Sequence, residues 1–348
     1  MPPQQHKPLH RLQLMLMLIR KKNMNIGRVS ENIYKRSVEK YINQTNNEIK
    51  KGATAGADCA LFVSDDAVIT TAVGYCSEPH RLCGSHAVYR ACAKLACKGG
   101  VPGMFNVTIT LPEKYREIKL KEIVADICKA ALAAKARIDN VYAETVAGIE
   151  LPVVSVSVVG FRTKEVMSTS KQSLAGASIV MTRWMAMSGA ARIAEEHRDE
   201  LLGRYPSFIV DDAMALEQFY NVIPEAAVAV NSGALRVQAI SDGGVFAGLW
   251  ELADRDGVGL EVNLHDIPVR QESIEVCEFF DINPYKLESD GSILIVTNEP
   301  DELIGKLTAI EVQATQIGRI TEGLDRVLIA DEERRFLEPP RQDEVHMI

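Results

Sequence analysis

An acid followed by two glycines, Asp242, Gly243 and Gly244, leads directly into a segment with helical periodicity. Paired glycines let backbone N–H groups converge, and the N-terminus of a helix adds positive potential at the same place. Phosphates and other anions bind at such turns, although an isolated Asp-Gly-Gly is more often an ordinary turn. We therefore interpret these three residues as a candidate phosphate-binding turn. How strongly they indicate such a site depends on the other motifs in the sequence.

The composition is that of an ordinary globular protein. The 348 residues are 47% hydrophobic and 25% charged, and a chain of this length favours two domains of about 150 residues each. The formal net charge of −8 argues against binding to nucleic acid or to an anionic membrane, because both require a basic surface. Any phosphate site must therefore be local.

The seven cysteines are scattered along the chain and include no Cys-x-x-Cys pair. Cys76 and Cys83, with His80 and His86 nearby, do not reproduce a zinc-finger spacing. We interpret the cysteines as buried or reduced thiols, in preference to a structural zinc site. The odd count predicts a reducing, cytoplasmic location.

The first residues contain an apolar stretch, 12–19, between basic residues. Eight residues are too few to cross a bilayer, which needs about 20, and no small-residue cleavage site follows the stretch. Met24 resembles a second start, so residues 1–24 are expected to be an extension that is disordered or loosely attached.

Hydrophobic periodicity predicts helices and strands in both halves of the chain without strict β-α-β repetition, which favours an α+β fold. A turn is expected at Gly189. The helices are expected at 28–50, 86–98, 118–136, 210–221, 242–253, 274–280 and 301–310, and the strands at 59–63, 67–73, 105–111, 153–159, 178–182, 259–264, 293–296 and 326–329.

Several short motifs occur in an order that resembles one known family. They are Gly56-Ala-Asp-Cys-Ala-Leu, Leu111-Pro-Glu, Ser241-Asp-Gly-Gly-Val-Phe, Ile267-Pro-Val-Arg-Gln-Glu and Asn283-Pro-Tyr. The chain resembles the aminoimidazole ribonucleotide (AIR) synthase-related, PurM-like superfamily. Within it the likeness is greatest to HypE-like hydrogenase expression/formation proteins, with thiamine-monophosphate kinase and selenophosphate synthetase more distant.

The resemblance implies a PurM-like α+β fold of two domains. The N-terminal domain, 25–168, would form a β-barrel across a homodimer, and the C-terminal domain, 169–338, would be a separate α+β unit. Residues 339–348 would form a flexible tail. Members bind ATP with a divalent metal in a cleft between the domains, and many transfer a phosphoryl group, which depends on carboxylates that hold the metal.

This sequence departs from the family at those carboxylates. Asp58 stands where the first acid is expected, in the glycine loop. The second, in a Thr-Asp-Pro turn, is replaced by Ala72, and the third, in an Asn-Asp-Leu-Ala motif, by Lys94. The Gly-Gly-x-Thr-Glu loop that approaches the nucleotide has become 140–144, where only Glu144 survives.

The exchange of acids for Lys94 changes what the site can hold. At an effective dielectric constant near 20, two unit charges about 4 Å apart interact by roughly 4 kcal/mol, so the lysine would repel Mg²⁺. It could instead neutralise a phosphate directly, or it could point to solvent or pair with an acid such as Glu144. We therefore expect no metal ligands, and we expect ATP or another phosphate-containing ligand to be bound by Asp58, Lys94, Glu144, Asp242, Gly243 and Gly244.

These substitutions favour a ligand-binding, regulatory or partner-binding homodimer with impaired Mg-ATP chemistry. The alternative is an active ATP-dependent phosphoryl-transfer enzyme, of the hydrogenase-maturation or small-molecule kinase type, whose metal is held by Asp58, Glu144 and Asp65 or Asp66. Whether the protein is an enzyme at all is left open by the sequence. The sequence has no cysteine after Cys277, whereas the hydrogenase-maturation branch carries one in its tail, so that reaction is disfavoured.

Overall fold

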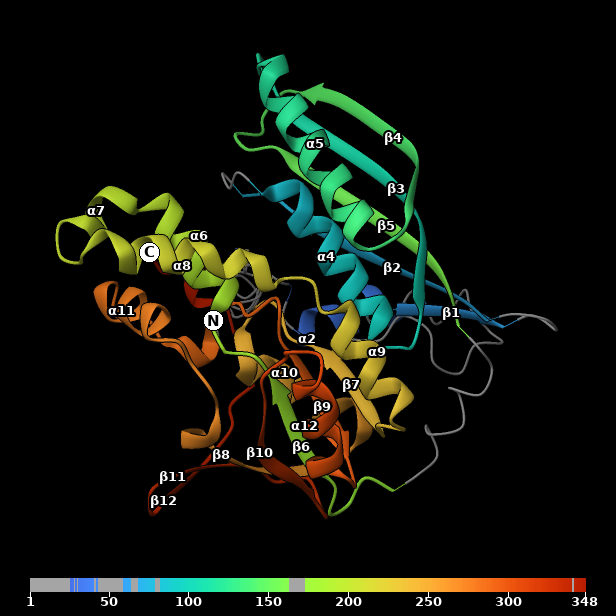
Figure 1. Cartoon of the computed structure of the whole chain (residues 1–348), viewed down its shortest axis with the longest axis vertical. Helices are drawn as coiled ribbons and strands as arrows, with labels where there is room; N and C mark the ends of the chain where they lie inside the picture. Colours follow the sequence, from blue (N-terminus) through green and yellow to red (C-terminus); the bar gives the residue numbers. More distant parts are fainter. Residues whose placement is uncertain are drawn as a thin grey trace, which may run out of the picture.

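The computed structural model describes residues 26–27, 29, 31–40, 42, 59–63, 68–78, 82–162, 173–339 and 341–348 (Figure 1). Asp58, Asp65, Asp66 and the predicted extension 1–24 lie outside these residues. Two sheets are present, each with helices packed against it, and they follow one another along the chain. Before the first sheet come the helical turn α2, Glu31–Tyr34, and the π-helical turn η1, Lys35–Glu39.

The N-terminal sheet has five strands in the order β1-β2-β5-β3-β4. Neighbouring strands are antiparallel except β3 and β4, which are parallel. The strands are β1 (Cys59–Val63), β2 (Val68–Cys76), β3 (Val101–Pro112), β4 (Arg137–Val146) and β5 (Val153–Arg162).

Two helices, α4 (Cys83–Ala96) and α5 (Glu117–Ala133), cover one face of this sheet (Figure 1). Residues along β2 alternate between buried and more exposed positions, as expected for a strand with one covered face. The opposite face carries exposed apolar side chains, among them Val73 and Phe161. In the described chain, therefore, the N-terminal sheet packs on one side only.

The C-terminal sheet has seven strands in the order β12-β11-β8-β10-β6-β9-β7, of which β8 and β11 are the parallel pair. Every residue of β9 is buried, which explains its continuous apolar sequence Ile-Leu-Ile-Val. The strands are β6 (Ser178–Thr182), β7 (Arg236–Ala239), β8 (Gly259–Asn263), β9 (Ile293–Thr297), β10 (Ala314–Thr321), β11 (Arg326–Ala330) and β12 (Glu333–Phe336).

Helices of the C-terminal half surround this sheet or pack on one another beside it (Figure 1). They are α6 (Met187–Glu196), α7 (Arg198–Leu202), α8 (Ser207–Ala215), α9 (Ile223–Asn231), α10 (Gly244–Asp256), α11 (Gln271–Phe279) and α12 (Pro300–Thr308), with 3-10 turns η3 (Leu216–Phe219), η4 (Leu264–Asp266), η5 (Pro284–Lys286) and η6 (Glu344–His346). Among the described residues, no helix is both long enough and apolar enough to span a bilayer.

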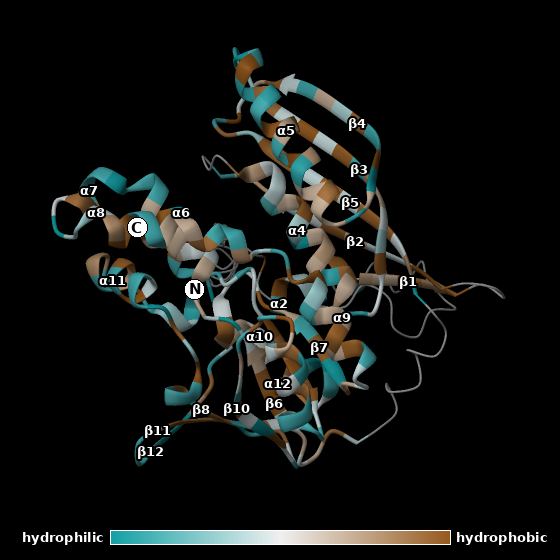
Figure 2. Ribbon diagram, in the orientation of Figure 1, coloured by the Kyte–Doolittle hydropathy of each residue, from teal (hydrophilic) through white to brown (hydrophobic). Residues whose placement is uncertain are grey.

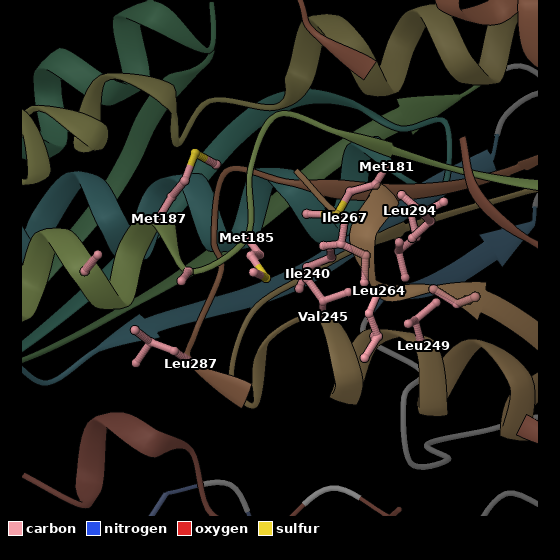
Figure 3. Packing of buried hydrophobic residues seen from close by; sticks show 14 of the residues in the cluster. Met181, Met185, Met187, Ile240, Val245, Leu249, Leu264, Ile267, Leu287 and Leu294 are labelled. Atoms are coloured by element: carbon pink, nitrogen blue, oxygen red, sulfur yellow. The ribbon is translucent and has the colours of Figure 1, made fainter. Parts of the chain in front are cut away.

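The C-terminal core joins side chains from strands, helices and the connecting loops. Hydrophobic residues concentrate along its central strands (Figure 2). Figure 3 shows part of this packing, including Met181, Met185, Met187, Ile240, Val245, Leu249, Leu264, Ile267, Leu287 and Leu294.

Helix α4 belongs to both halves of the molecule. Ala87, Val88 and Leu95 on one side pack into the core of the N-terminal sheet. Ala93 and Ala96 on another side pack into a cluster that includes residues of α9, β7 and β9. Because small side chains allow close approach on both sides, this helix is the main structural link between the two sheets.

The predicted α+β class is confirmed, and three local expectations differ from the structure. Residues 140–144 are part of strand β4 and not a loop. Gly189 lies inside α6, where a Cβ atom would come within 2.3 Å of the Leu287 side chain, so this glycine serves close packing and not a turn. The tail predicted to be flexible packs on the protein, with Asp343 and Val345 buried.

Candidate functional site

Three basic residues, His86, Arg90 and Lys94, are spaced by four along α4 and therefore lie on one side of the helix. That side faces the end of β2. The approach is close, since a Cβ atom at Gly74 would lie 2.3 Å from the carbonyl oxygen of Ala87. Glycine at position 74 thus allows α4 to bring its basic residues against the strand.

Arg90 is the centre of a buried group of charged side chains, which we name the interdomain charge cluster. Its guanidinium lies 2.8 Å from the Asp290 carboxylate and 3.0 Å from that of Glu288. It also lies 3.5 Å from Asp242, and it donates a hydrogen bond to the carbonyl oxygen of Tyr75. The cluster consists of Glu78, His86, Arg90, Arg192, Asp242, Glu288 and Asp290.

His86 and Glu78 form the part of the cluster nearest to β2. Nε2 of His86 lies 3.1 Å from Oδ2 of Asp290, and Nδ1 lies 3.5 Å from Oε2 of Glu78. The other oxygen of Glu78, Oε1, lies 3.5 Å from Arg192 and 3.7 Å from Arg90. The two halves of the chain are therefore joined by ion pairs that are almost fully withdrawn from water.

The loop that carries Glu288 and Asp290 is held by the start of α6. The backbone N–H of Asp290 donates to Oγ of Ser188, and the backbone N–H of Ala186 donates to Oγ of Ser289. Gly291 has φ +97° and packs against the carbonyl oxygen of Phe219, so no other residue fits there without strain. This scaffold fixes the two acids opposite Arg90.

The cluster strongly perturbs its acids and its histidine. Burial, followed by the repulsion from Glu78, raises the pKa of Glu288 to about 8. Burial and Arg90 oppose a charge on His86, yet Asp290 and Glu78 outweigh them and raise its pKa to about 10. Burial alone would raise the pKa of Asp290, but Arg90 and His86 lower it well below its ordinary value.

At neutral pH the positive and negative charges in this cluster therefore nearly balance. Arg90, Arg192 and protonated His86 face the carboxylates of Glu78, Asp242 and Asp290, while Glu288 holds its proton. The cluster therefore carries little net charge of its own. Removal of one charged side chain from the cluster would leave an uncompensated charge buried between the two halves of the chain.

The predicted phosphate turn lies at the edge of this cluster. Gly243 and Gly244 have φ of +76° and +64°, and a Cβ atom at Gly244 would lie 2.5 Å from the carbonyl oxygen of Leu287. The N–H of Gly244 donates to Ser241, and the N–H of Gly243 donates to the carboxylate of Asp343. In this structure the protein's own tail therefore occupies the donor of Gly243.

The remaining predicted site residues do not gather at this turn. Lys94 donates a hydrogen bond of 3.0 Å to the carbonyl oxygen of Val73, and on α4 it is Arg90, one turn earlier, that contacts Asp242. Glu144 lies on the edge strand β4, exposed, and accepts a hydrogen bond from the Tyr142 hydroxyl. Asp58 lies outside the described residues.

The positions at which the resemblance implies metal-binding acids do meet in space. Ala72 pairs with Cys59 across β1 and β2, and Lys94 is bonded to Val73, the residue after Ala72. At this place the described residues offer Mg²⁺ an ammonium group and a methyl group where carboxylates are required. These two residues therefore do not fit a metal–ATP complex.

The sequence reasoning missed most of the charge cluster. Glu78, Arg90, Arg192 and Glu288 have no role in the sequence analysis, and His86 enters it only as a neighbour of the cysteines. A usable signal was present in α4, whose charged or titratable residues recur every four positions in an otherwise small and apolar helix. Such a stripe on a buried helix predicts buried partners of opposite charge.

Comparison with known proteins agrees with this architecture. The sequence pattern of the AIR synthase related protein family matches the chain over both of its domains, the N-terminal domain at residues 52–161 and the C-terminal domain at residues 175–331. The chain belongs to this family.

The chain is also similar to two curated relatives. A hydrogenase expression/formation protein of Methanocaldococcus jannaschii is 19% identical over 79% of this chain and 81% of its own length. The carbamoyl dehydratase HypE of Rhizobium leguminosarum is 23% identical over 76% of this chain and 77% of its own.

Among solved structures, a chain of a HypE–HypF complex superposes with a TM-score of 0.69 at 16% identity, covering 87% of this chain and 100% of its own. A ThiL bound to AMPPCP and TMP superposes with a TM-score of 0.66 at 19% identity, covering 89% and 97%. At these identities the structural likeness establishes the two-domain PurM-like fold.

Proposed function

We propose that this protein binds a phosphate-containing ligand, ATP or a related anion, without magnesium-dependent phosphoryl transfer, and acts as a regulatory or partner-binding subunit. One observation carries the proposal. The ammonium group of Lys94 lies 3.0 Å from the carbonyl oxygen of Val73 and beside buried Ala72, where the resemblance implies two metal-binding acids. A fixed positive charge at that place opposes a divalent cation and favours a bare phosphate.

The nucleotide class of the ligand is supported by the structural neighbours. One is a ThiL complexed with AMPPCP, and another is a HypE complexed with ATP, which superposes with a TM-score of 0.65 at 15% identity. We carry over the ligand class alone, since the residues that hold the metal differ here. A phosphate that binds at Gly243 would replace the carboxylate of Asp343 on the same N–H group.

Calorimetric titration with ATP, once with excess Mg²⁺ and once with EDTA, tests the proposal. We expect ATP to bind in EDTA at least as tightly as with Mg²⁺, because the positive charge of Lys94 opposes the cation, and we expect no release of ADP. The double variant Ala72→Asp with Lys94→Asp is the matched comparison, in which binding should become dependent on Mg²⁺. Binding by the natural sequence only with Mg²⁺, with turnover, would instead assign an active enzyme.

The assembly that we propose is a cytoplasmic homodimer formed through the N-terminal sheet. Its uncovered face and its edge strand β1 expose Phe62 at 66%, Val73 at 49% and Phe161 at 53%. Apolar faces and free strand edges of this kind are normally covered by a partner, and a second copy would close the barrel that the family resemblance implies. A protein partner is a further expectation, in line with the HypE–HypF neighbour.

Light scattering of the natural protein tests the dimer. Phe62→Asp should shift the mass from dimer towards monomer, because a charge would be buried in the interface. Leu324→Asp is the matched control, since Leu324 is 69% exposed but lies in the C-terminal domain, away from the uncovered sheet face. A monodisperse monomer of the natural sequence would contradict the proposed assembly.

A further inference from the structure

Potential metal ligands converge where β2 ends and α4 begins. Sγ of Cys76, a carboxylate oxygen of Glu78 and a ring nitrogen of His86 lie within 4.8 Å of one another, and all three residues are buried. Cys83, the first residue of α4, adds a second thiol, which is hydrogen-bonded to the side chain of Cys76 and to the backbone of Glu78. One sulfur, one nitrogen and one oxygen therefore face a common point, and the sulfur of Cys83 lies beside that of Cys76.

The histidine is oriented as a metal ligand would be. Its Nε2 lies 3.1 Å from the Asp290 carboxylate, which directs Nδ1 towards Glu78 and the thiols. A carboxylate that accepts the second N–H of a histidine is the usual support of a metal-bound imidazole, because it fixes the tautomer and the ring orientation. Asp290 would provide that support while remaining outside the ligand set.

The Glu78 carboxylate provides an independent observation. Its Oε1 faces the two arginines Arg90 and Arg192, whereas its Oε2 is buried and forms no hydrogen bond within the described part of the chain. Oε2 lies 3.5 Å from Nδ1 of His86, longer than a good hydrogen bond. At this separation the two atoms suit two ligands of one ion better than a direct hydrogen bond.

We propose that Cys76, Glu78, Cys83 and His86 bind one zinc-class divalent cation in a closed tetrahedral site. Thiolate and imidazole ligands select zinc and similar transition metals, while Mg²⁺ and Ca²⁺ take oxygen ligands. None of the four residues is more than 4% exposed, so no coordination position is open to a substrate. The site is therefore structural and ties the end of β2 to the first turn of α4.

This site is separate from the place where the family resemblance implies magnesium. Cys76 lies four residues beyond Ala72 on β2, about 13 Å along the strand. Binding of the cation transfers the thiol protons and any imidazole proton to solvent. Two thiolates and the Glu78 carboxylate around a divalent ion leave one negative charge, which the neighbouring Arg90 and Arg192 offset.

Cobalt titration of the full-length protein tests the site. The protein is purified with a reductant, stripped with a chelator and titrated with Co²⁺ alone. We expect one ion per chain, a thiolate-to-cobalt charge-transfer band in the near ultraviolet, intense visible bands of tetrahedral cobalt, and displacement by Zn²⁺. Absence of the charge-transfer band in the natural sequence would overturn the proposal.

Variants provide the second measurement, with zinc content determined by mass spectrometry of the metal. Cys76→Ala and His86→Ala should each lose the bound ion, and Asp290→Asn should weaken binding by about 10- to 100-fold as a positioning residue. Cys277→Ala, a buried cysteine of α11, should keep it. Full zinc content in Cys76→Ala, or a Cys76–Cys83 disulfide with no metal uptake after its reduction, would also overturn the site.

Discussion

Replacement of Arg90 by methionine removes the cation at the centre of the interdomain charge cluster. The guanidinium lies 2.8 Å from Asp290 and 3.0 Å from Glu288, and the Arg90 side chain is 6% exposed. Methionine keeps most of the volume, so the change isolates the charge. The buried carboxylates then lack their main partner and must either stay charged or take up a proton.

The loss of stability can be estimated from the free energy needed to protonate a buried carboxylate at the working pH. An aspartate with an ordinary pKa of about 3.9 is protonated at pH 7 at a cost of about 4 kcal/mol, at about 1.4 kcal/mol for each pH unit. This agrees with the loss of about 3 to 5 kcal/mol that follows when one partner of a buried ion pair is removed. At pH 5 the cost of protonating the same carboxylate is only about 1.5 kcal/mol. The loss in free energy of unfolding caused by Arg90→Met should therefore become smaller as the pH falls.

Calorimetric and guanidinium unfolding of the natural and variant proteins at pH 7 and pH 5 measures both values. For domains of 150–250 residues, about 4 kcal/mol corresponds to a fall in Tm of about 8 to 16 °C. Arg319→Met is the matched control, since Arg319 forms an exposed pair with Glu261 and should cost less than about 1 kcal/mol. An Arg90→Met protein within about 1 kcal/mol of the natural one at pH 7 would refute this account of the cluster.

Three further predictions concern the acids and the glycine turn. Glu288 has a folded pKa of about 8, raised above its ordinary value of 4.5, so its contribution to stability is fully present below that ordinary value and is lost as the pH rises to about 8. Glu288→Gln should therefore flatten the fall in Tm between about pH 5 and pH 8, and an unchanged slope would contradict this. Gly244→Ala should lower the free energy of unfolding by about 3 kcal/mol, because Gly244 has a positive φ and an added Cβ atom would meet the Leu287 carbonyl oxygen. Gly257 has the same φ of +64° but open space around it, so Gly257→Ala should lower it by only about 1 kcal/mol. Denaturant titrations measure both values. Asp343→Ala should free the N–H of Gly243 and tighten ATP binding by about tenfold in calorimetry, and weaker binding would exclude a ligand at this turn.

The strongly patterned elements of the fold could be predicted from the sequence. The valine-rich strand β5 and the amphipathic helix α5 each have a clear period, and the structure has both. The family resemblance implies a loop at 140–144, whereas the structure has strand β4 there. Its residues are almost all exposed, so its sequence lacks the apolar alternation that would indicate a strand. Gly189 was misread because a glycine in a helix interior can serve close packing, here against Leu287, as well as a turn.

The candidate site was less predictable because its members are far apart in the chain. Arg90 and Asp290 are separated by 200 residues, and an isolated charged residue is normally expected at the surface. The glycine turn could be found because its residues are contiguous. The hydrogen bond from Gly243 to Asp343 could not, because it forms only when the C-terminal tail folds back on the turn, and no short sequence motif indicates that. The exchange of an acid for Lys94 was visible only through the family resemblance.

The central proposal is that Ala72 and Lys94 provide no carboxylate at their two positions to hold a metal beside a bound phosphate. Electron paramagnetic resonance of Mn²⁺, a spectroscopic stand-in for Mg²⁺, tests it most directly in the presence of a non-hydrolysable ATP analogue. We expect the natural protein to add no protein oxygen to the ligands of Mn²⁺, and the variant that carries aspartates at positions 72 and 94 to add such ligands. A spectrum altered by the natural protein, with Mn²⁺ ligated by protein oxygens beside Lys94, would contradict the claim.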